Sequence, residues 1–169
     1  MPLQLYKIAS NDLSTSTSTV TFSSIPQGYT DLKIVMSGRD NAASTRSIPR
    51  LTFNSSTSGY SSKALYGVNG GTVGSENGGS TYIDWSYITA ANATSSTFGN
   101  TEIYIPNYTS SNNKSVSIEF VAETNSASSG ILGIAAGLWS NSAAITSISL
   151  DRSTDSFVQY STFTLYGIL

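Results

Sequence analysis

Residues Thr19–Gly38 read TVTFSSIPQGYTDLKIVMSG, and they contain two short runs in which every second residue is apolar. In the first run, Val20 and Phe22 alternate with threonine and serine. In the second run, apolar residues occupy alternate positions from Leu32 to Met36. Side chains along a strand point alternately to its two faces, so this pattern predicts two strands that each bury one face.

The segment between the two runs favours a turn. Pro26 fixes its own φ and has no amide hydrogen to donate, and Gly28 tolerates a positive φ. We therefore expect Ile25–Thr30 to be a turn region that completes a strand–turn–strand unit. Two strands alone are marginally stable in water, so other parts of the chain must cover the apolar face of this unit.

Further short runs with strand character follow, separated by segments rich in glycine, serine and asparagine. They predict additional strands at Leu3–Ala9, Ser47–Asn54, Thr81–Thr89, Thr101–Tyr108, Ser115–Glu123, Ile131–Trp139, Ala144–Leu150 and Phe157–Leu169. Ile131–Trp139 is mostly apolar and is interpreted as a buried strand. Asn69–Ser80 is rich in glycine, serine and asparagine and is expected to be a long surface loop. Pro49 should place the early part of its strand at a sheet edge or a bulge.

No stretch has the apolar spacing of an amphipathic helix, and short strands between turn signals are typical of a sandwich or barrel. The sequence predicts a single all-β domain over residues 1–169, an antiparallel β-sandwich with jelly-roll-like connections. The chain has LQLYKIA near its start and FTLYGIL at its end, and we expect these strands to pair because pairing leaves fewer open sheet edges. The predicted core comprises Val20, Phe22, Leu32, Ile34, Met36, Leu51, Phe53, Ile118, Phe120, Ile148, Leu150, Phe163 and Leu165.

The composition limits the classes of partner. Only 11% of the 169 residues are charged and the formal net charge is −2, with no basic cluster. A nucleic-acid-binding surface needs a cationic footprint, so no nucleic-acid partner is expected. No apolar run approaches the roughly 20 residues that span a bilayer, and the start lacks the pattern of a signal peptide, so no membrane association is expected.

The residue types also exclude several kinds of catalytic and metal site. The chain contains no histidine and no cysteine, which removes histidine general bases, cysteine nucleophiles and zinc sites built from these residues. The glycine-rich stretch Asn69–Ser80 lacks the lysine of a phosphate-binding loop. We therefore expect no catalytic residue, no cofactor and no metal, and a protein that is not an enzyme.

Paired carboxylates are the one catalytic arrangement that the composition leaves open, because glycosidases need only two of them. Asp84 is the best candidate because it lies beside Trp85 and close to Tyr87, and aromatic rings stack on sugars. The alternative is an exposed carboxylate on the outer side of a strand. Asp151 and Asp155 flank a loop arginine and are interpreted as part of a solvated turn.

The ten tyrosines offer material for a binding surface, because tyrosine provides a large contact area at low entropic cost. The candidate interaction surface consists of Tyr60, Tyr82, Asp84, Tyr104 and Tyr108. An equally weighted alternative is that half of the tyrosines in the middle of the chain pack in the core, with the hydroxyl reaching the surface.

Val20–Arg39, VTFSSIPQGYTDLKIVMSGR, resembles a hairpin pattern that recurs in small structural proteins of tailed bacteriophages, especially those of marine cyanobacteria. Trp139–Leu150 and Ser161–Leu169 fit the C-terminal part of the same proteins, and Leu5–Ala9 fits their start. The matching segments lie towards both ends of the chain. Residues 41–113 match only in general character.

The resemblance implies a β-sandwich component of the virion, with no catalytic residues to carry over. One implied role is a capsid cement or decoration protein, a homotrimer on the capsid exterior that bridges major capsid subunits. The alternative is a tail-fibre or spike module that binds host surface glycans, and a carboxylate-dependent carbohydrate-active enzyme using Asp84 is a remote alternative. A polar, weakly charged surface favours the capsid role, because a lattice multiplies weak contacts.

Overall fold

The computed structural model describes residues 4–68, 72–125 and 129–169. These residues form strands and turns and no helix, and every ladder between named strands is antiparallel. The prediction of an all-β antiparallel fold is therefore confirmed.

Two sheets contain most of the strands. In spatial order, the eight-stranded sheet contains β1 (Leu5–Asp12), β13 (Thr162–Ile168), β3 (Asp31–Gly38), β9 (Gly99–Ile105), β10 (Lys114–Ala122), β11 (Ile131–Trp139), β6 (Tyr60–Val68) and β7 (Thr72–Asn77). The three-stranded sheet contains β2 (Thr19–Phe22), β12 (Ile148–Asp151) and β5 (Arg50–Phe53). Two short strands, β4 (Arg46–Ser47) and β8 (Ile88–Thr89), pair with each other.

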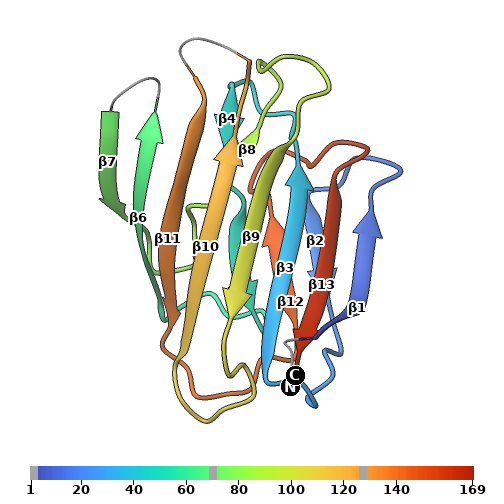
Figure 1. Ribbon diagram of the computed structural model, residues 1–169, viewed down its shortest axis with the longest axis vertical. Coiled ribbons are helices and arrows are strands. Elements are labelled where there is room, and N and C mark those ends of the chain that lie inside the picture. Colours follow the sequence, from blue (N-terminus) through green and yellow to red (C-terminus); the bar gives the residue numbers. More distant parts are fainter. Residues whose placement is uncertain (1–3, 69–71, 126–128) are drawn as a thin grey trace.

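The apolar core lies between the large sheet and a second layer (Figure 1). The three-stranded sheet lies behind the half of the large sheet that contains β3 and β13. Residues 81–88 cover the other half. There the ring of Trp85 stacks on Tyr66 of β6 at 6.0 Å, and Tyr87 lies 5.5 Å from Phe120 of β10. The second layer is thus part sheet and part irregular chain.

Every residue predicted for the core is buried, which confirms the core assignment. These residues are Val20, Phe22, Leu32, Ile34, Met36, Leu51, Phe53, Ile118, Phe120, Ile148, Leu150, Phe163 and Leu165. Their burial follows from alternation along the strands. On β10, for example, buried and exposed residues alternate along the whole strand.

The prediction that Thr19–Gly38 forms a hairpin is wrong. The two strands exist, but β2 pairs with β12 in the small sheet, whereas β3 pairs with β13 and β9 in the large sheet. The segment that contains Pro26 and Gly28 therefore crosses between layers. Alternation identifies which face of a strand is buried, and it carries no information about the neighbouring strand.

The predicted pairing of the terminal strands is confirmed. Leu5 on β1 lies opposite Ile168 on β13, and the ladder continues to Asp12 opposite Thr162 with a bulge between Lys7 and Ala9. The two strands lie side by side in Figure 1. Together they form one edge region of the large sheet, with β1 outermost.

Two assignments in the middle of the chain are wrong. Thr81–Thr89 is not a continuous strand: only Ile88–Thr89 pairs as β8, and Ile83 makes an isolated bridge to Leu51. Trp85 has a φ of 76°, which interrupts an extended strand. Asn69–Ser80 is not simply a loop, because Thr72–Asn77 forms the edge strand β7; its residues 69–71 lie outside the described residues.

Pro49 lies where the sequence predicted, whereas Ile131–Trp139 agrees with its prediction only in part. Pro49 lies between β4 and β5, as a residue without an amide hydrogen should. Ile131–Trp139 is a strand, but only one of its faces is buried, and Leu132 and Ile134 point away from the core with 62% and 56% of their surface exposed. The large sheet therefore has an outer face that carries apolar side chains.

Candidate functional site

The outer face of the large sheet carries four half-exposed aliphatic side chains on three adjacent strands. They are Leu65 on β6 (50% exposed), Val121 on β10 (48%), and Leu132 (62%) and Ile134 (56%) on β11. Leu132 lies directly opposite Val121, and Ile134 lies directly opposite Leu65. We call these four residues the apolar patch. They border a shallow depression of about 450 Å³.

Polar groups occupy the neighbouring part of the same face. Lys33 on β3 forms an ion pair with Glu102 on β9 at 2.6 Å. The hydroxyl of Tyr104 donates a hydrogen bond to a carboxylate oxygen of Asp31 at 2.6 Å, and this bond raises the pKa of Tyr104. These groups already satisfy one another, so the apolar patch is the part of the face that would gain most from being covered.

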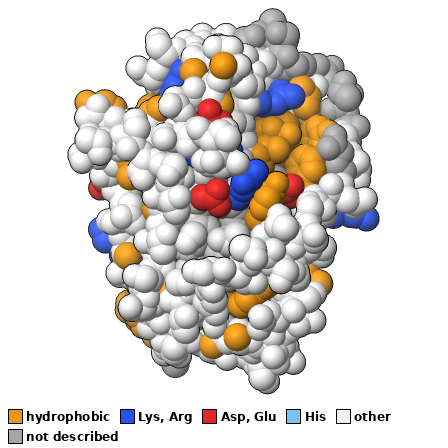
Figure 2. Space-filling view, turned by 180° about the vertical axis from the view of Figure 1, so that it is seen from behind, with side chains coloured by type: hydrophobic (Ala, Val, Ile, Leu, Met, Phe, Trp, Pro, Cys, Tyr) orange, Lys and Arg blue, Asp and Glu red, His pale blue; other side chains and the backbone are white. Residues whose placement is uncertain are grey.

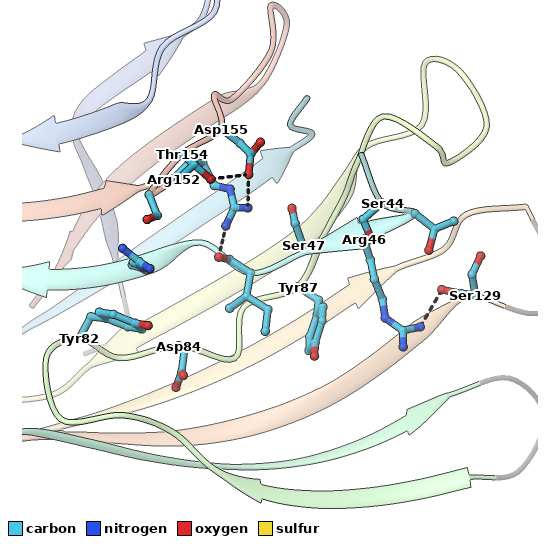
Figure 3. A pocket seen from close by; sticks show the side chains of 14 residues that line it. Ser44, Arg46, Ser47, Tyr82, Asp84, Tyr87, Ser129, Arg152, Thr154 and Asp155 are labelled. Carbon is cyan, nitrogen blue, oxygen red and sulfur yellow. Dashed lines mark hydrogen bonds and ion pairs between the residues drawn. The ribbon is translucent and has the colours of Figure 1, made fainter. Parts of the chain in front are cut away.

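A polar pocket of about 680 Å³ opens between the second-layer segments. Its lining comes from residues 44–48 and Arg50, from Tyr82, Asp84 and Tyr87, from Ser129 and from residues 152–155. Figure 2 views the molecule from the side of the second layer and shows acidic and basic side chains gathered beside apolar ones in the middle of that side. In Figure 3, Tyr82 and Asp84 lie across the pocket from Arg152 and Asp155.

One wall of the pocket is held by a buried ion pair. Asp40 is fully buried, and its carboxylate lies 2.6 Å from Nε of Arg152. The same carboxylate accepts hydrogen bonds from the hydroxyl of Ser47 and from the amide of Ala42. Arg152 also donates to the carbonyl of Ile48. These bonds tie the end of β3, the β4–β5 segment and the loop after β12 into one unit.

Two other arginines of the pocket each lie over a tyrosine ring. The guanidinium carbon of Arg50 is 4.5 Å from the ring centre of Tyr82, and that of Arg46 is 5.7 Å from the ring centre of Tyr87. Arg46 also donates a hydrogen bond to the carbonyl of Ser129 at 3.0 Å. Within the described residues, neither guanidinium forms an ion pair with a carboxylate.

The carboxylates of the pocket differ in their surroundings. Asp84 is half-buried and accepts a hydrogen bond from the hydroxyl of Ser62 on β6. Asp155 lies 3.6 Å from the guanidinium of Arg152. Asp151, just behind the lining, pairs in register with Arg50; burial raises its pKa, while the charges of Arg50 and Arg152 act in the opposite direction.

The five residues of the predicted interaction surface do not lie together. Tyr60 and Tyr108 are buried, contrary to the prediction. The hydroxyl of Tyr60 accepts a hydrogen bond from the amide of Phe53 at 2.8 Å, and that of Tyr108 donates to the carbonyl of Pro26. Both tyrosines serve the core, which agrees with the alternative weighed for them.

The other three residues are divided between the two candidate surfaces. Tyr104 lies on the outer face of the large sheet, and Tyr82 and Asp84 line the polar pocket. Asp84 is not on a strand, because the segment around it is irregular. Asp151 belongs to β12 rather than to a turn, while Asp155 lies in the following loop.

Sequence reasoning missed the apolar patch and the stacked arginines. A signal for the patch was present: Ile131–Trp139 carries apolar residues on both faces, and in a sheet with a single cover one of those faces has to be exposed. No comparable signal marked Arg46 and Arg50, because their positions over Tyr87 and Tyr82 depend on contacts between segments far apart in the chain.

The remaining observations concern metal sites, membrane-spanning helices and similarity to known proteins. Among residues 4–68, 72–125 and 129–169, no group of three or more acidic, histidine or cysteine side chains is arranged to hold a metal ion. The same described segments contain no helix that is long and apolar enough to cross a membrane. Comparisons with protein-family models, curated proteins and solved structures found no match.

Proposed function

We propose that this protein is a structural component of a bacteriophage virion, a cement or decoration protein that binds the capsid exterior and bridges major capsid subunits without catalysing a reaction. The proposal combines the resemblance of Val20–Arg39, Trp139–Leu150 and Ser161–Leu169 to phage structural proteins with one observation. That observation is the apolar patch on the outer face of the large sheet.

The size of the patch suits repeated weak contacts. Burying a complete aliphatic side chain contributes about 1.5–3 kcal/mol, and the four patch residues are each about half exposed. Their combined gain is enough for a modest interface, but the entropy lost on association consumes much of it. On a capsid, one particle presents many equivalent sites, so bridging contacts gain strength from multivalency.

The rigidity of the patch also favours a lattice contact. Its residues belong to three strands with complete antiparallel ladders between them, so little ordering is required on binding. Charged residues make up only 11% of the chain, which limits long-range attraction of a partner. Recognition would then depend on shape and apolar contact at short range.

Two further parts of the proposal concern the oligomeric state and the way in which the strands are connected. The protein is proposed to form a homotrimer on the capsid, because association stabilises small particle proteins that lack disulfides. Jelly-roll wiring is proposed for the sandwich, supported by β2–β3 and β12–β13 connections that each pass from the small sheet to the large one. Light scattering of the purified protein, alone and bound to capsids, tests the trimer.

The first test is immunogold labelling of intact virions with an antibody against this chain. Gold spread over the heads is the expected result. Gold confined to the tails would overturn the capsid role and favour the alternative, a tail module that binds host glycans. No gold on intact particles, with a working antibody, would overturn both exterior positions.

A binding experiment then tests the patch itself. Capsids lacking this protein are incubated with the parent protein, with Ile134→Lys and with Leu5→Lys. Ile134 and Leu5 are each 56% exposed on the large sheet, but Leu5 lies at the opposite edge on β1. Ile134→Lys should lose capsid binding and Leu5→Lys should keep it. Equal binding by all three proteins would overturn the role of the patch.

The remote enzymatic alternative has its own test. If Asp84 acted in a carboxylate pair, the parent protein would cleave a glycan and a folded Asp84→Asn variant would not. Absence of such activity in the parent protein, across a panel of bacterial surface glycans, is the expected result. Cleavage that disappears in the variant would replace the structural role with an enzymatic one.

A further inference from the structure

The polar pocket has the dimensions of a ligand site. Its volume of about 680 Å³ lies within the roughly 300–1,000 Å³ typical of small-molecule sites. Arginine, aspartate, tyrosine, serine and threonine side chains dominate its lining, and Ile48 is its one aliphatic residue. Such a lining suits a ligand that carries many polar groups.

The two stacked arginines provide the positive part of the site. Arg50 lies over Tyr82, and Arg46 lies over Tyr87 with one N–H bonded to the carbonyl of Ser129. A guanidinium has five N–H donors in a planar fork that matches a carboxylate. Because neither arginine has an ion-pair partner among the described residues, donors remain for an anionic group of a ligand.

The same pocket also contains groups that disfavour a simple anion. Asp84 lines it, and an ionised carboxylate only accepts hydrogen bonds. A ligand that fits must therefore present hydroxyl donors to Asp84 as well as a negative group to the arginines. The serine and threonine hydroxyls of the lining can pair with further hydroxyls. An acidic saccharide combines these features in one molecule.

The walls are preformed. Ile83 exchanges two backbone hydrogen bonds with Leu51, at 2.8 and 2.9 Å, which fixes the segment that carries Tyr82 and Asp84. On the other side, the buried pair of Asp40 and Arg152 fixes the loop after β12. A ligand would then meet a largely ordered site, which reduces the entropic cost of binding.

We propose that this pocket binds an acidic saccharide, with the carboxylate of the sugar on Arg50 and its hydroxyls on Asp84. This site is independent of the capsid proposal. It is built from second-layer segments, whereas the apolar patch lies on the outer face of the large sheet. A virion protein with both surfaces would attach to the particle through one and contact a cell-surface glycan through the other.

Isothermal titration calorimetry with defined probes tests the proposal. Sialyllactose and trigalacturonate serve as acidic probes, lactose and maltotriose as neutral probes, and inorganic phosphate as a free anion. At least one acidic saccharide should bind at least tenfold more tightly than its neutral counterpart. Equal binding of acidic and neutral sugars, binding of phosphate alone, or no binding of any probe would overturn the proposal.

Variants locate the site. Arg50→Gln should weaken binding of the acidic saccharide at least tenfold, and Lys7→Gln, which removes one positive charge from β1, should leave it unchanged. Asp84→Asn should weaken binding of the acidic saccharide, because a neutral amide accepts hydrogen bonds from sugar hydroxyls less strongly than a carboxylate does. Thermal unfolding confirms that each variant is folded. Equal effects of Arg50→Gln and Lys7→Gln would overturn the assignment.

The capsid-binding proposal and the saccharide-binding proposal can be refuted independently of each other. Ile134→Lys should keep the affinity for the acidic saccharide, since the patch does not line the pocket. Arg50→Gln should keep capsid binding. Loss of saccharide binding in Ile134→Lys would contradict the independence of the two surfaces.

Discussion

Replacing Asp40 with alanine should be among the most destabilising single changes in the second layer. The Asp40 side chain has no exposed surface, and the side chain of its partner Arg152 is 10% exposed. Their charged atoms are 2.6 Å apart, and Asp40 also accepts hydrogen bonds from Ser47 and Ala42. Removing the carboxylate leaves a nearly buried guanidinium and two further donors with their partner gone.

The expected magnitude follows from burial. Breaking a buried ion pair by removing one partner costs about 3–5 kcal/mol. Asp155, at 3.6 Å and partly exposed, compensates the remaining charge of Arg152 only in part. The total unfolding free energy of a domain is about 5–15 kcal/mol, so the loss is a large fraction of stability. For a chain of this length, the midpoint of thermal unfolding should fall by roughly 6–20 °C.

Asp155→Ala is the matched control. Asp155 contacts the same guanidinium, but at 3.6 Å and with 32% of its side chain exposed. A partly exposed pair of this kind is worth about 0–1 kcal/mol. The control therefore removes the same functional group from the same arginine, but at a more exposed and more distant position that lacks the hydrogen bonds from Ser47 and Ala42.

Urea unfolding monitored by tryptophan fluorescence measures both variants, since the chain contains two tryptophans. The slope of free energy against urea should stay constant, which shows that the same surface is exposed on unfolding. The double variant Asp40→Leu with Arg152→Met should lose less unfolding free energy than the sum of the losses in Asp40→Leu and in Arg152→Met. In the double variant the ion pair is replaced by apolar side chains, and no unpaired charge remains. A loss for Asp40→Ala no larger than that for Asp155→Ala would refute the reasoning.

Two further predictions concern a tyrosine and a glycine of the core. Burial raises the pKa of Tyr108 above its usual value near 10, so its contribution to stability is present below about pH 10 and is lost as the pH rises towards the folded-state pKa. Tyr108→Phe should therefore flatten the decline of unfolding free energy above pH 10, measured by urea unfolding at a series of pH values, and an unchanged decline would contradict this. A Cβ at Gly137 would lie 2.8 Å from Cδ1 of Ile83, so Gly137→Ala should cost about 1–3 kcal/mol by overpacking. Adding Ile83→Ala should make the double variant more stable than additivity predicts; strict additivity would show that the two residues do not compete for space.

Sequence reasoning identified strand faces well because alternation is a local property. The buried positions of β3 and β10 could be read from residues two apart, and each of the predicted core residues is buried. The terminal pairing of β1 with β13 was also predicted, from two similar apolar segments and the need to close a sheet edge. These features depend on the order of residues within single segments or on simple rules for sheets.

The pairing of β2 and β3 was predicted wrongly for a physical reason. A proline–glycine segment between two strands allows either a hairpin or a crossing between layers, and the choice depends on which other strands satisfy the backbone hydrogen bonds. Here β12 pairs with the backbone hydrogen-bonding groups of β2, and β13 and β9 pair with those of β3. Such partners come from the far end of the chain, which no local pattern identifies.

By itself, then, the sequence determined an all-β antiparallel fold, the residues of its core and the absence of histidine and cysteine chemistry, because composition and period-two alternation are written in the order of residues. The tertiary structure decided which tyrosines are buried and which apolar faces remain uncovered. It also decided that Arg50, Asp84 and Asp155 share one pocket. Those outcomes depend on contacts between residues far apart in the chain, and only the packing of the two layers brings such residues together.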